Sequence, residues 1–458
     1  MAGRAFISFG AVVALLTAPS LVLAQSAGDI DAAVQAAMTA SQTPSASVAV
    51  VKDGKVVYAR AFGDAILSPE VAATPATRYQ IASVSKEFTA AAVLLLQEDG
   101  KLSLDDTVAK WFPDLTSADK ITVRQLLSHT SGYSDYWPQD YVMTMVTLPT
   151  TPQAVMDAYA KAPLDYQPGD DWQYSNTGYV VAGQIVEKAS GQPLFQFLQE
   201  RILKPVGIND AFDITDANLT APDAMGYQRQ GLGPNRPAPL AGRGWTYAAW
   251  PLALTAEDVA KWDASILKRS LLKPSSYDTQ VQTIKLNNGK DSGYAMGLFV
   301  RSDNGHRMYQ HGGEGAGFLS DNRIYPDDNL AIVVLTNTMS GSAHTDIADR
   351  ISFMYLPLLG PDATVLALFE GLQAGQVDRA GFTANFNAYL TDTALADFQA
   401  NLGSLGKPVT FKLAGSSLRG GMEARSYRVR TQSGKLVSVS VYLTKDGKIE
   451  QFLVSLPV

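Results

Sequence analysis

One segment constrains the fold of this chain more than any other, the run SVSKEFTAAAVLLLQE from Ser83 to Glu98. It is rich in helix-forming residues, its later part is apolar nearly all round, and Asp99-Gly100 closes it. A helix without a polar face has to be enclosed by other elements. The sequence therefore predicts a helix buried in the middle of a domain.

The patterns on either side of this helix predict a sheet that is interrupted by a long helical section. Residues 47–63 favour two strands around an Asp53-Gly54 turn, and residues from about 101 to 265 are mostly helical patterns broken by Pro and Gly. Three later stretches again indicate strands: YAMGLFVRS (294–302), HRMYQHGG (306–313) and LAIVVLTNT (330–338). We expect a sheet with a helical insertion rather than alternating βαβ units.

The character of the chain changes near residues 359–365, and residues 366–458 predict a small α+β domain of their own. A run of short helical patterns is followed by four alternating strands, VTFKLAGSS, EARSYRVRT, KLVSVSVYLT and IEQFLVSL. This part contains no His and no catalytic cluster. We expect it to serve structure or recognition.

The first 24 residues are typical of a secretory signal peptide, with a basic start, a short apolar core and small residues before a cleavage point near Ala24. A membrane anchor is the alternative, but the apolar core is short for a span. No later segment has 18 uninterrupted apolar residues, so we expect no membrane span in the mature protein. A periplasmic or secreted bacterial protein is the expected localisation.

Composition excludes several kinds of site. The 458 residues contain no cysteine, which rules out disulfides, thiol catalysis and cysteine metal sites. The net charge is −7 and no basic cluster is present, so a nucleic-acid partner is not expected. The four histidines show no metal-binding spacing, and no metal is expected.

The pattern S-x-x-K joins a nucleophile to a base when serine and lysine share one face of a buried helix. Burial favours the neutral amine, which can then accept the serine proton. Ser83 meets these conditions because it opens the apolar helix and Lys86 follows one turn later. The other matches lie in polar, amphipathic or turn segments: Ser117/Lys120, Ser265/Lys268, Ser270/Lys273 and Ser404/Lys407.

Two further motifs supply the remaining chemistry of an acyl transfer. WQYSNTGY presents Tyr174 as a proton relay if a nearby cation lowers its pKa, and Asn176 two residues later points the same way. YQHGGEGAGF offers His311 and Gly313 beside a backbone that a substrate can approach closely. The N–H groups of Ser83 and Glu314 would form an oxyanion hole. Taken alone, a Y-x-N sequence is equally typical of a polar loop, and an H-G-G sequence is equally typical of a tight turn.

These motifs occur in the order S-x-x-K, Y-x-N, H-x-G, with about 90 and 135 residues between them. In this the chain resembles the class C β-lactamase-like serine hydrolases, which include penicillin-binding-protein-like DD-peptidases, D-aminopeptidases and esterases. The resemblance covers roughly residues 29–360. It extends to GKLSLDDTVAKWFPDL, ITVRQLLSHTSGY, QPGDDWQYSNTGYVVAGQIVEKASGQPL and LKPVGI.

The resemblance implies an α/β (α+β) fold, with an antiparallel sheet flanked by helices, an all-helical region, and the active site between them. It implies that Ser83 is acylated, that Lys86 shares its proton, and that Tyr174 acts as general base and proton shuttle. Asn176 would orient Lys86 and the substrate amide. His311 would stand where β-lactamases place a lysine. No cofactor is implied.

Departures from the family pattern bear on the substrate. True β-lactamases carry K-T-G where this chain has His311-Gly312-Gly313, so a fixed charge and a hydroxyl for the substrate carboxylate are missing. Glu314 adds a negative charge that should repel carboxylates. Trp250-Pro251 should reshape another wall of the cleft.

We therefore expect a serine hydrolase of small ester or amide substrates, with D-amino-acid peptides as one candidate class, and with weak or no β-lactamase activity. The alternative is a non-catalytic protein of the same fold that binds cell-wall or peptide ligands. The oligomeric state stays open at this point.

Overall fold

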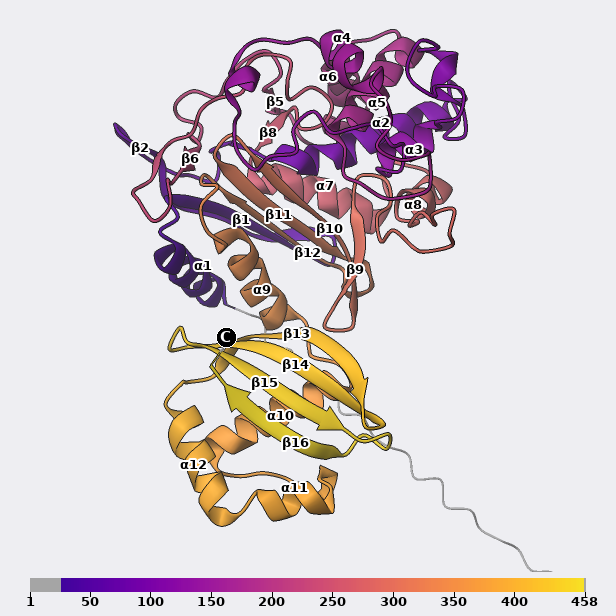
Figure 1. The fold of residues 1–458 in the computed structure, drawn as a ribbon. Helices are drawn as coiled ribbons and strands as arrows, with labels where there is room; N and C mark the ends of the chain where they lie inside the picture. Colours follow the sequence, from indigo (N-terminus) through magenta and orange to yellow (C-terminus); the bar gives the residue numbers. More distant parts are fainter. Residues whose placement is uncertain (1–25, 457–458) are drawn as a thin grey trace, which may run out of the picture.

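The computed structural model describes residues 26–456, and its largest element is a seven-stranded antiparallel sheet in the order β3-β2-β1-β12-β11-β10-β9 (Figure 1). The expected Asp53-Gly54 turn joins β1 to β2, and both residues have positive φ. The proposed signal peptide lies outside the described residues. The strands are β1 Ser45–Lys52, β2 Lys55–Leu67, β3 Glu70–Ala72, β9 Phe299–Asp303, β10 His306–Gly315, β11 Phe318–Tyr325 and β12 Leu330–Thr336.

Helices cover both faces of this sheet. α1 (Ala27–Ser41) and α9 (Ala343–Tyr355) pack on one face, while α7 (Ala256–Lys268) packs on the other (Figure 1). α2 (Ser85–Glu98) lies beyond α7, where the rings of Phe88 and Trp262 stack 4.5 Å apart. Every residue from Ser85 to Leu96 is buried. The prediction of an enclosed helix is confirmed.

The section between the two groups of strands is less helical than the sequence indicated. Residues 207–250 contain no α-helix, because Gly and Pro recur there and favour turns. The section's helices are α3 Val123–Leu127, α4 Pro152–Val155, α5 Asn176–Ser190 and α6 Leu194–Leu198, and α8 Pro274–Gln280 follows α7. Two small sheets are also present. One has three strands, in the order β4 (Tyr79–Gln80), β8 (Leu252–Leu254), β5 (Phe212–Asp213), and the other pairs β6 (Tyr227–Gln228) with β7 (Arg236–Pro237).

β11 was not visible in the apolar pattern of the sequence. All eight of its residues are buried, yet its middle reads Ser320, Asp321, Asn322, Arg323. These polar side chains have partners on other elements, such as the backbone oxygen of Ile81, which accepts from Ser320 Oγ at 2.9 Å. A buried strand normally reads as a hydrophobic run, so a polar one escapes detection.

The strand that was expected over residues 294–302 begins only at Phe299. Gly293 and Gly297 have positive φ, which breaks the extended conformation before that point. A Cβ atom on Gly297 would lie 2.8 Å from the backbone oxygen of Lys86. The loop before β9 therefore packs directly on the first turn of α2.

The C-terminal part of the chain forms a second, four-stranded antiparallel sheet in the order β13-β14-β15-β16 (Figure 1). The four predicted strands are present, and three helices pack with the sheet around a separate apolar core that includes Phe369, Phe411 and Phe452. Within residues 26–456, no helix has both the length and the apolar character of a membrane span. The elements are α10 Pro361–Ala374, α11 Ala384–Tyr389, α12 Asp392–Gly403, β13 Pro408–Arg419, β14 Met422–Thr431, β15 Leu436–Leu443 and β16 Ile449–Ser455.

Candidate active site

Ser83 lies in a short helical turn, Ala82–Val84, that leads directly into α2. The preceding Ala82 has a φ of 48°, so the backbone bends sharply just before the serine. Ser320 Oγ holds the turn by donating to the oxygen of Ile81 at 2.9 Å. The serine is half-buried and lines a cleft of about 600 Å³ between the sheet and the helical region.

Lys86 is wholly buried under this serine. Its Nζ donates to Ser83 Oγ at 3.0 Å, to Asn176 Oδ1 at 2.8 Å and to the oxygen of Ala249 at 2.9 Å. The three acceptors match the three donors of an ammonium group. Burial lowers the pKa of Lys86 to about 7, although the charge of Asp135 opposes this shift. A substantial fraction of the amine is therefore neutral near neutral pH.

Tyr174 and Asn176 reach the same place from the start of α5. Ser175 caps this helix, with its side chain accepting from the N–H of Gly178, and both neighbours of Ser175 line the cleft. The Nζ of Lys86 lies 4.9 Å from the centre of the Tyr174 ring. Burial raises the pKa of Tyr174 well above its usual value, and a hydrogen bond with Ser83 opposes this only in part. The shift is opposite to the lowering that a base role would need.

His129 is buried against Tyr174, with ring centres 4.2 Å apart. Its Nδ1 accepts from the N–H of Ser175 at 3.1 Å, so its proton is on Nε2. This hydrogen bond fixes the backbone of Ser175, which lies between Tyr174 and Asn176 in the chain. These contacts are those of a structural histidine that supports the Tyr174–Asn176 segment.

Asp135 is a member of the site that the sequence patterns did not single out. It accepts from the N–H and the Nδ2 of Asn176, at 3.0 and 3.2 Å, and it lines the cleft. Burial raises its pKa, and Lys86 opposes that rise. Asn176 therefore bridges the amine of Lys86 and this carboxylate. The sequence signal that could have identified Asp135 is its position two residues after SHTSGY.

β10 forms the wall opposite Tyr174. β9 pairs only with residues 306–310, so the β10 edge from His311 to Gly315 is left free of β9 where it borders the cleft. A Cβ atom on Gly313 would lie 2.2 Å from Ser320 Oγ and 2.3 Å from the oxygen of Ile81. Only glycine therefore lets this strand approach the Ser83 turn so closely.

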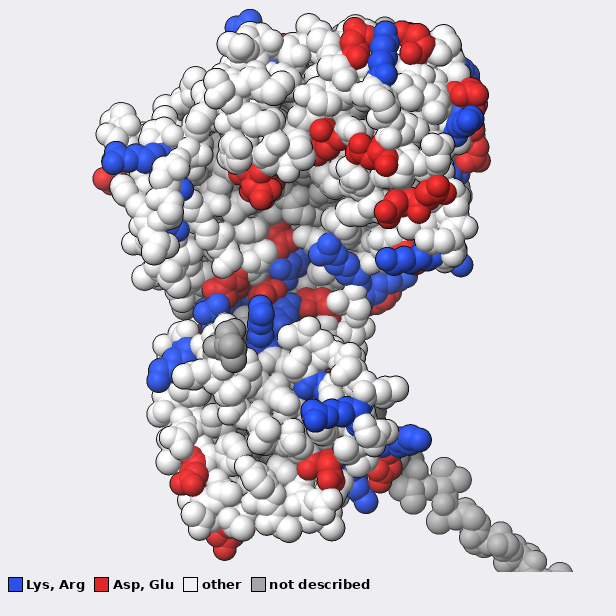
Figure 2. All heavy atoms as spheres, viewed as in Figure 1, with Lys and Arg blue, Asp and Glu red and all other residues white. Residues whose placement is uncertain are grey.

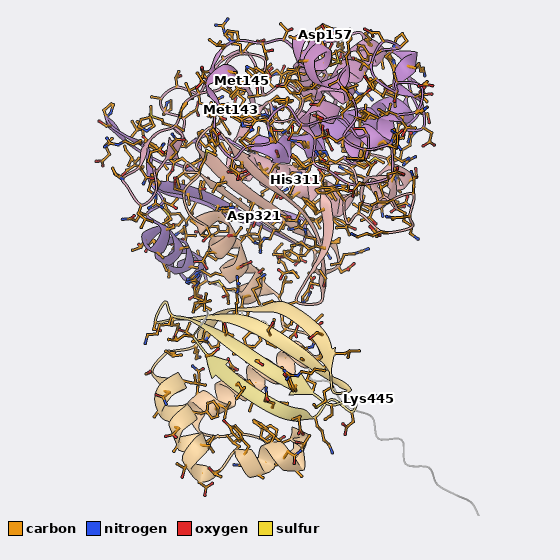
Figure 3. All side chains as sticks on the ribbon, in the orientation of Figure 1. Met143, Met145, Asp157, His311, Asp321 and Lys445 are labelled. Carbon is orange, nitrogen blue, oxygen red and sulfur yellow. The ribbon has the colours of Figure 1, made fainter. Side chains whose placement is uncertain are left out.

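His311 is buried in this wall and is neutral. Its Nδ1 donates to the oxygen of Gly312 at 2.6 Å, which leaves Nε2 to accept from the hydroxyl of Tyr294 at 3.0 Å. Burial, with the nearby charge of Lys86, lowers the pKa of His311 to about 3. The imidazole therefore lacks the fixed charge of a lysine, as the sequence indicated. Figure 3 shows His311 on β10.

Charged and aromatic side chains complete the cleft lining. Glu314 and Asp140 both line the cleft, and partial burial together with the charge of Asp140 raises the pKa of Glu314. Arg301 on β9 lies over the ring of Phe299 at 4.0 Å and was missed from the sequence. Trp250 packs edge-on against Trp137, with ring centres 5.1 Å apart. Trp250 lines the cleft, as its bulk suggested.

The structure thus gathers six of the seven predicted site residues around one cleft and places Lys86 directly beneath it. These six are Ser83, Tyr174, Asn176, His311, Gly313 and Glu314. In the described part of the chain, no group of three or more His, Asp or Glu is arranged to hold a metal ion. A serine in contact with a buried lysine, in a cleft between an antiparallel sheet and a helical region, is the arrangement expected of a serine hydrolase.

The chain belongs to the beta-lactamase family, whose model matches residues 30–353. Among curated proteins, it is 31% identical over 324 residues to Protein flp of Staphylococcus aureus (strain MRSA252), covering 68% of this chain. It is 26% identical to Penicillin-binding protein 4* of Bacillus subtilis (strain 168), over 64% of this chain and 67% of that protein. The chain spans 63% of the length of the S. aureus relative.

Solved structures share the fold. A D-stereospecific amidohydrolase from Streptomyces sp. superposes with a TM-score of 0.61 at 25% identity, covering 71% of this chain and 98% of that one. An octameric penicillin-binding protein homologue from Pyrococcus abyssi gives a TM-score of 0.62 at 22% identity, over 94% of this chain and 100% of that one. The second match extends over most of the C-terminal part as well.

Proposed function

We propose that the protein hydrolyses small esters and amides through an acyl-enzyme formed on Ser83. The observation that carries this proposal is the contact of 3.0 Å between Lys86 Nζ and Ser83 Oγ. The amine is wholly buried and its pKa lies near 7, so it is a base at neutral pH.

In the first step, neutral Lys86 accepts the Ser83 proton while Oγ bonds to the substrate carbonyl carbon. The carbonyl oxygen takes the negative charge and accepts from the N–H groups of Ser83 and Glu314 at the free edge of β10. Asn176 accepts a hydrogen bond from Lys86 Nζ and donates to Asp135, which keeps the amine aimed at the serine. This arrangement needs no ion bound in the cleft.

Collapse of the intermediate requires a proton for the leaving group. Tyr174 is a neutral phenol that is hydrogen-bonded to Ser83, and it supplies this proton while protonated Lys86 replenishes it. We therefore assign Tyr174 the role of proton shuttle and Lys86 that of the base. Water activated by the same pair then attacks the acyl-serine ester and releases the acid, which restores Ser83.

Charge at the cleft supports a substrate that carries an amino group rather than a carboxylate near the acyl carbon. Glu314 and Asp140 both line the cleft and repel each other, and within residues 26–456 neither side chain has an ion-pair or hydrogen-bond partner. An ammonium group between them would relieve their repulsion. The D-stereospecific amidohydrolase of the same fold adds support for D-amino-acid amides as one substrate class. We accordingly propose weak or no β-lactamase activity.

A rate panel on wild type and Ser83→Ala tests this function. The panel contains p-nitrophenyl butyrate, D-alanine p-nitroanilide and nitrocefin, with a fluorophosphonate probe for covalent labelling. We expect ester turnover to be fastest and cephalosporin turnover slight. Ser83→Ala should lower kcat/KM by about 10⁴-fold and abolish labelling, because the nucleophile is lost.

Ser404→Ala is the matched control, since Ser404 also begins an S-x-x-K sequence but is exposed in the C-terminal part. Its rates should equal those of wild type. Turnover that survives Ser83→Ala, or the absence of both turnover and labelling in wild type, would contradict the proposal. In the latter case, ligand binding that is equal in wild type and Ser83→Ala would favour the binding-protein alternative.

We also propose that the protein is exported and loses residues 1–24, on the sequence pattern alone. N-terminal sequencing of the protein purified from a periplasmic or culture-medium fraction of a bacterial host tests this. A mature chain that starts near Gln25 is expected, and an intact Met1 in the cytoplasmic fraction would contradict it.

A further inference from the structure

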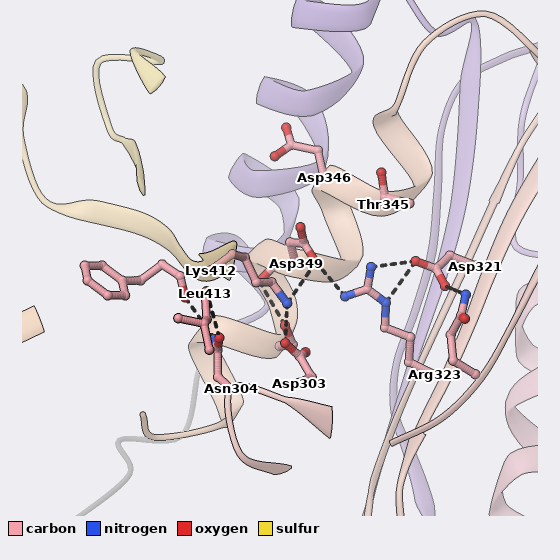
Figure 4. Close-up of polar contacts among 12 residues, drawn as sticks. Asp303, Asn304, Asp321, Arg323, Thr345, Asp346, Asp349, Lys412 and Leu413 are labelled. Atoms are coloured by element: carbon pink, nitrogen blue, oxygen red, sulfur yellow. Dashed lines mark hydrogen bonds and ion pairs between the residues drawn. The ribbon is translucent and has the colours of Figure 1, made fainter. Parts of the chain in front are cut away.

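The hairpin of β9 and β10 (residues 299–315), which forms one wall of the cleft, is fastened to the C-terminal domain at its turn. Asn304 donates through Nδ2 to the oxygen of Phe411 at 2.8 Å and accepts from the N–H of Leu413 at 3.3 Å. Both partners are backbone groups of β13. The amide side chain therefore occupies the place of a neighbouring strand on this edge (Figure 4).

Lys412, between these two backbone contacts, enters a cluster of acidic groups. Its Nζ lies 2.6 Å from Asp303 Oδ1 at the end of β9 and 3.0 Å from Asp349 Oδ1 on α9. Burial alone would raise the pKa of Asp303, but the charge of Lys412 holds it below its usual value. Figure 2 shows positive and negative side chains gathered at this junction between the two parts of the molecule.

From Asp349 the contacts continue beneath the sheet to the cleft. Arg323 Nη1 lies 2.6 Å from Asp349, and Arg323 Nη2 lies 2.7 Å from Asp321, whose Oδ1 accepts from Gln310 Nε2 at 3.0 Å (Figure 4). Arg323 and Asp321 are buried. Gln310 lines the cleft and immediately precedes His311. Positive and negative side chains alternate along the path from Lys412 to Asp321, so each charge is neutralised by its neighbours on the path.

The groups of the proposed chemistry are held differently. Lys86 is fixed by Ser83, Asn176 and the oxygen of Ala249, and Tyr174 lies at the start of α5. None of these contacts involves the C-terminal domain. The path from Lys412 therefore reaches the wall that borders the substrate, and bypasses the base and the nucleophile.

We propose that Lys412 is a positioning residue, through which the C-terminal domain holds the β9–β10 wall in its substrate-binding position. This inference rests on the proposed function, because it takes the β9–β10 wall to be part of the substrate-binding surface. Without the lysine, Asp303 loses its ion-pair partner and Asp349 keeps only Arg323, so the two carboxylates repel each other and the hairpin is held to β13 by the Asn304 contacts alone. The wall residues Phe299, Arg301 and Gln310 are then no longer held in one fixed arrangement.

The kinetic test compares Lys412→Met with Lys445→Met in the full chain. Lys445 is exposed in the turn between β15 and β16, far from the junction in Figure 3. With the best ester of the panel, Lys412→Met should raise KM about 5- to 20-fold, while kcat stays within about twofold and the pH profile keeps its midpoint. Lys445→Met should match wild type, and Lys412→Arg should restore most of the KM.

A double-variant cycle tests the path itself. Gln310→Met breaks the contact at the other end, so its effect on KM and that of Lys412→Met should combine to less than their product. Independent, multiplicative effects would overturn the coupling. So would an unchanged KM in Lys412→Met, or an equal loss of kcat and shift of the pH profile.

Hydrogen exchange provides a readout that needs no turnover. Backbone amides of residues 299–313 should exchange at least about fivefold faster in Lys412→Met, and also in the milder Asn304→Ala, while those of α2 stay unchanged. If wild type proves inactive but this exchange pattern appears, the proposed function fails and the mechanical link stands. If wild type is active and exchange in the hairpin is unaltered in both variants, the link is wrong.

Discussion

In the proposed mechanism the base is the buried amine of Lys86. Its pKa lies near 7 because burial disfavours the charged form, and Asp135 limits the drop by favouring that form. Only the neutral amine can take the Ser83 proton. Activity should therefore rise with pH as Lys86 deprotonates, with a kcat/KM midpoint near 7 on the acid side.

Asp135→Asn tests this electrostatic balance. Removal of the carboxylate takes away the charge that raises the pKa of Lys86, so the amine should deprotonate at lower pH. The acid limb of the kcat/KM profile should move toward lower pH, while the amide oxygen of the new side chain can still accept from the N–H of Asn176. A limb that moves to higher pH, or does not move, would contradict the assignment of Lys86 as the base.

Gly313 controls how closely β10 approaches the Ser83 turn. Gly313→Ala places a methyl group within 2.3 Å of two fixed oxygens, so the strand must shift. We expect a loss of stability of about 1–3 kcal/mol and a fall in kcat/KM of at least about tenfold.

Gly312→Ala is the matched control for stability, since its Cβ would meet no atom closer than 3.5 Å. Thermal unfolding and steady-state rates measure the two variants. Equal unfolding temperatures for the two would show that β10 is not held against the serine turn.

At the scale of elements, α2 carries a second buried ionisable residue, Glu87, on the side away from the cleft. Trp262 Nε1 donates to its Oε2 at 2.8 Å, and Asn322 Nδ2 donates both to Glu87 at 3.2 Å and to the buried Asp263 at 3.0 Å. Burial raises the pKa of Glu87 to about 7. The contact among α2, α7 and β11 is thus most favourable when this carboxyl is protonated.

The sign of the pH dependence follows from that shift. Below pH 4.5 Glu87 is protonated in the folded and unfolded states alike; between 4.5 and about 7 only the folded state keeps the proton. Its contribution to stability is therefore lost as pH rises through this window, by on the order of 3 kcal/mol. Glu87→Gln should remove this part of the decline, so its unfolding free energy relative to wild type should increase from about pH 4 to about pH 8. A difference that is constant with pH would contradict the buried carboxyl.

β11 shows why an element at the centre of the sheet escaped the apolar pattern. Its polar residues are buried because each meets a partner from a distant segment: Ser320 meets the Ser83 turn, Asn322 meets α2 and α7, and Arg323 meets α9. No window of the sequence around β11 contains those partners. The strand is stable only once the other elements surround it.

For the whole molecule, the C-terminal part has an apolar core of its own, and its junction with the rest is largely polar and charged. Residues 359–458 expressed alone should therefore fold, with a cooperative thermal transition and dispersed amide resonances. Phe353 and Leu358 pack against this core from outside that fragment and would be missing, which should lower the midpoint. A fragment without any cooperative transition would show that the core depends on the larger part.

The sequence by itself determined what is local or ordered along the chain. The enclosed helix followed from its lack of a polar face, the β1–β2 hairpin from Asp53-Gly54, and Ser83, Tyr174 and His311 from motifs whose order matches the family. The strands of the C-terminal sheet followed from alternation. The helix, the hairpin turn and each motif can be read within one segment, because each depends on residues a few positions apart, and the order of the motifs can be read along the chain without any knowledge of contacts.

Only the tertiary structure decided the pKa values of the site groups and the contacts between distant segments. Asp135 and Arg301 joined the site from a loop and an edge strand, the pKa of Tyr174 rose where a fall was expected, and Lys412 came within reach of Asp303 from another domain. Desolvation and Coulomb energies depend on distance and burial in space, and both are set only when segments far apart in the chain pack together.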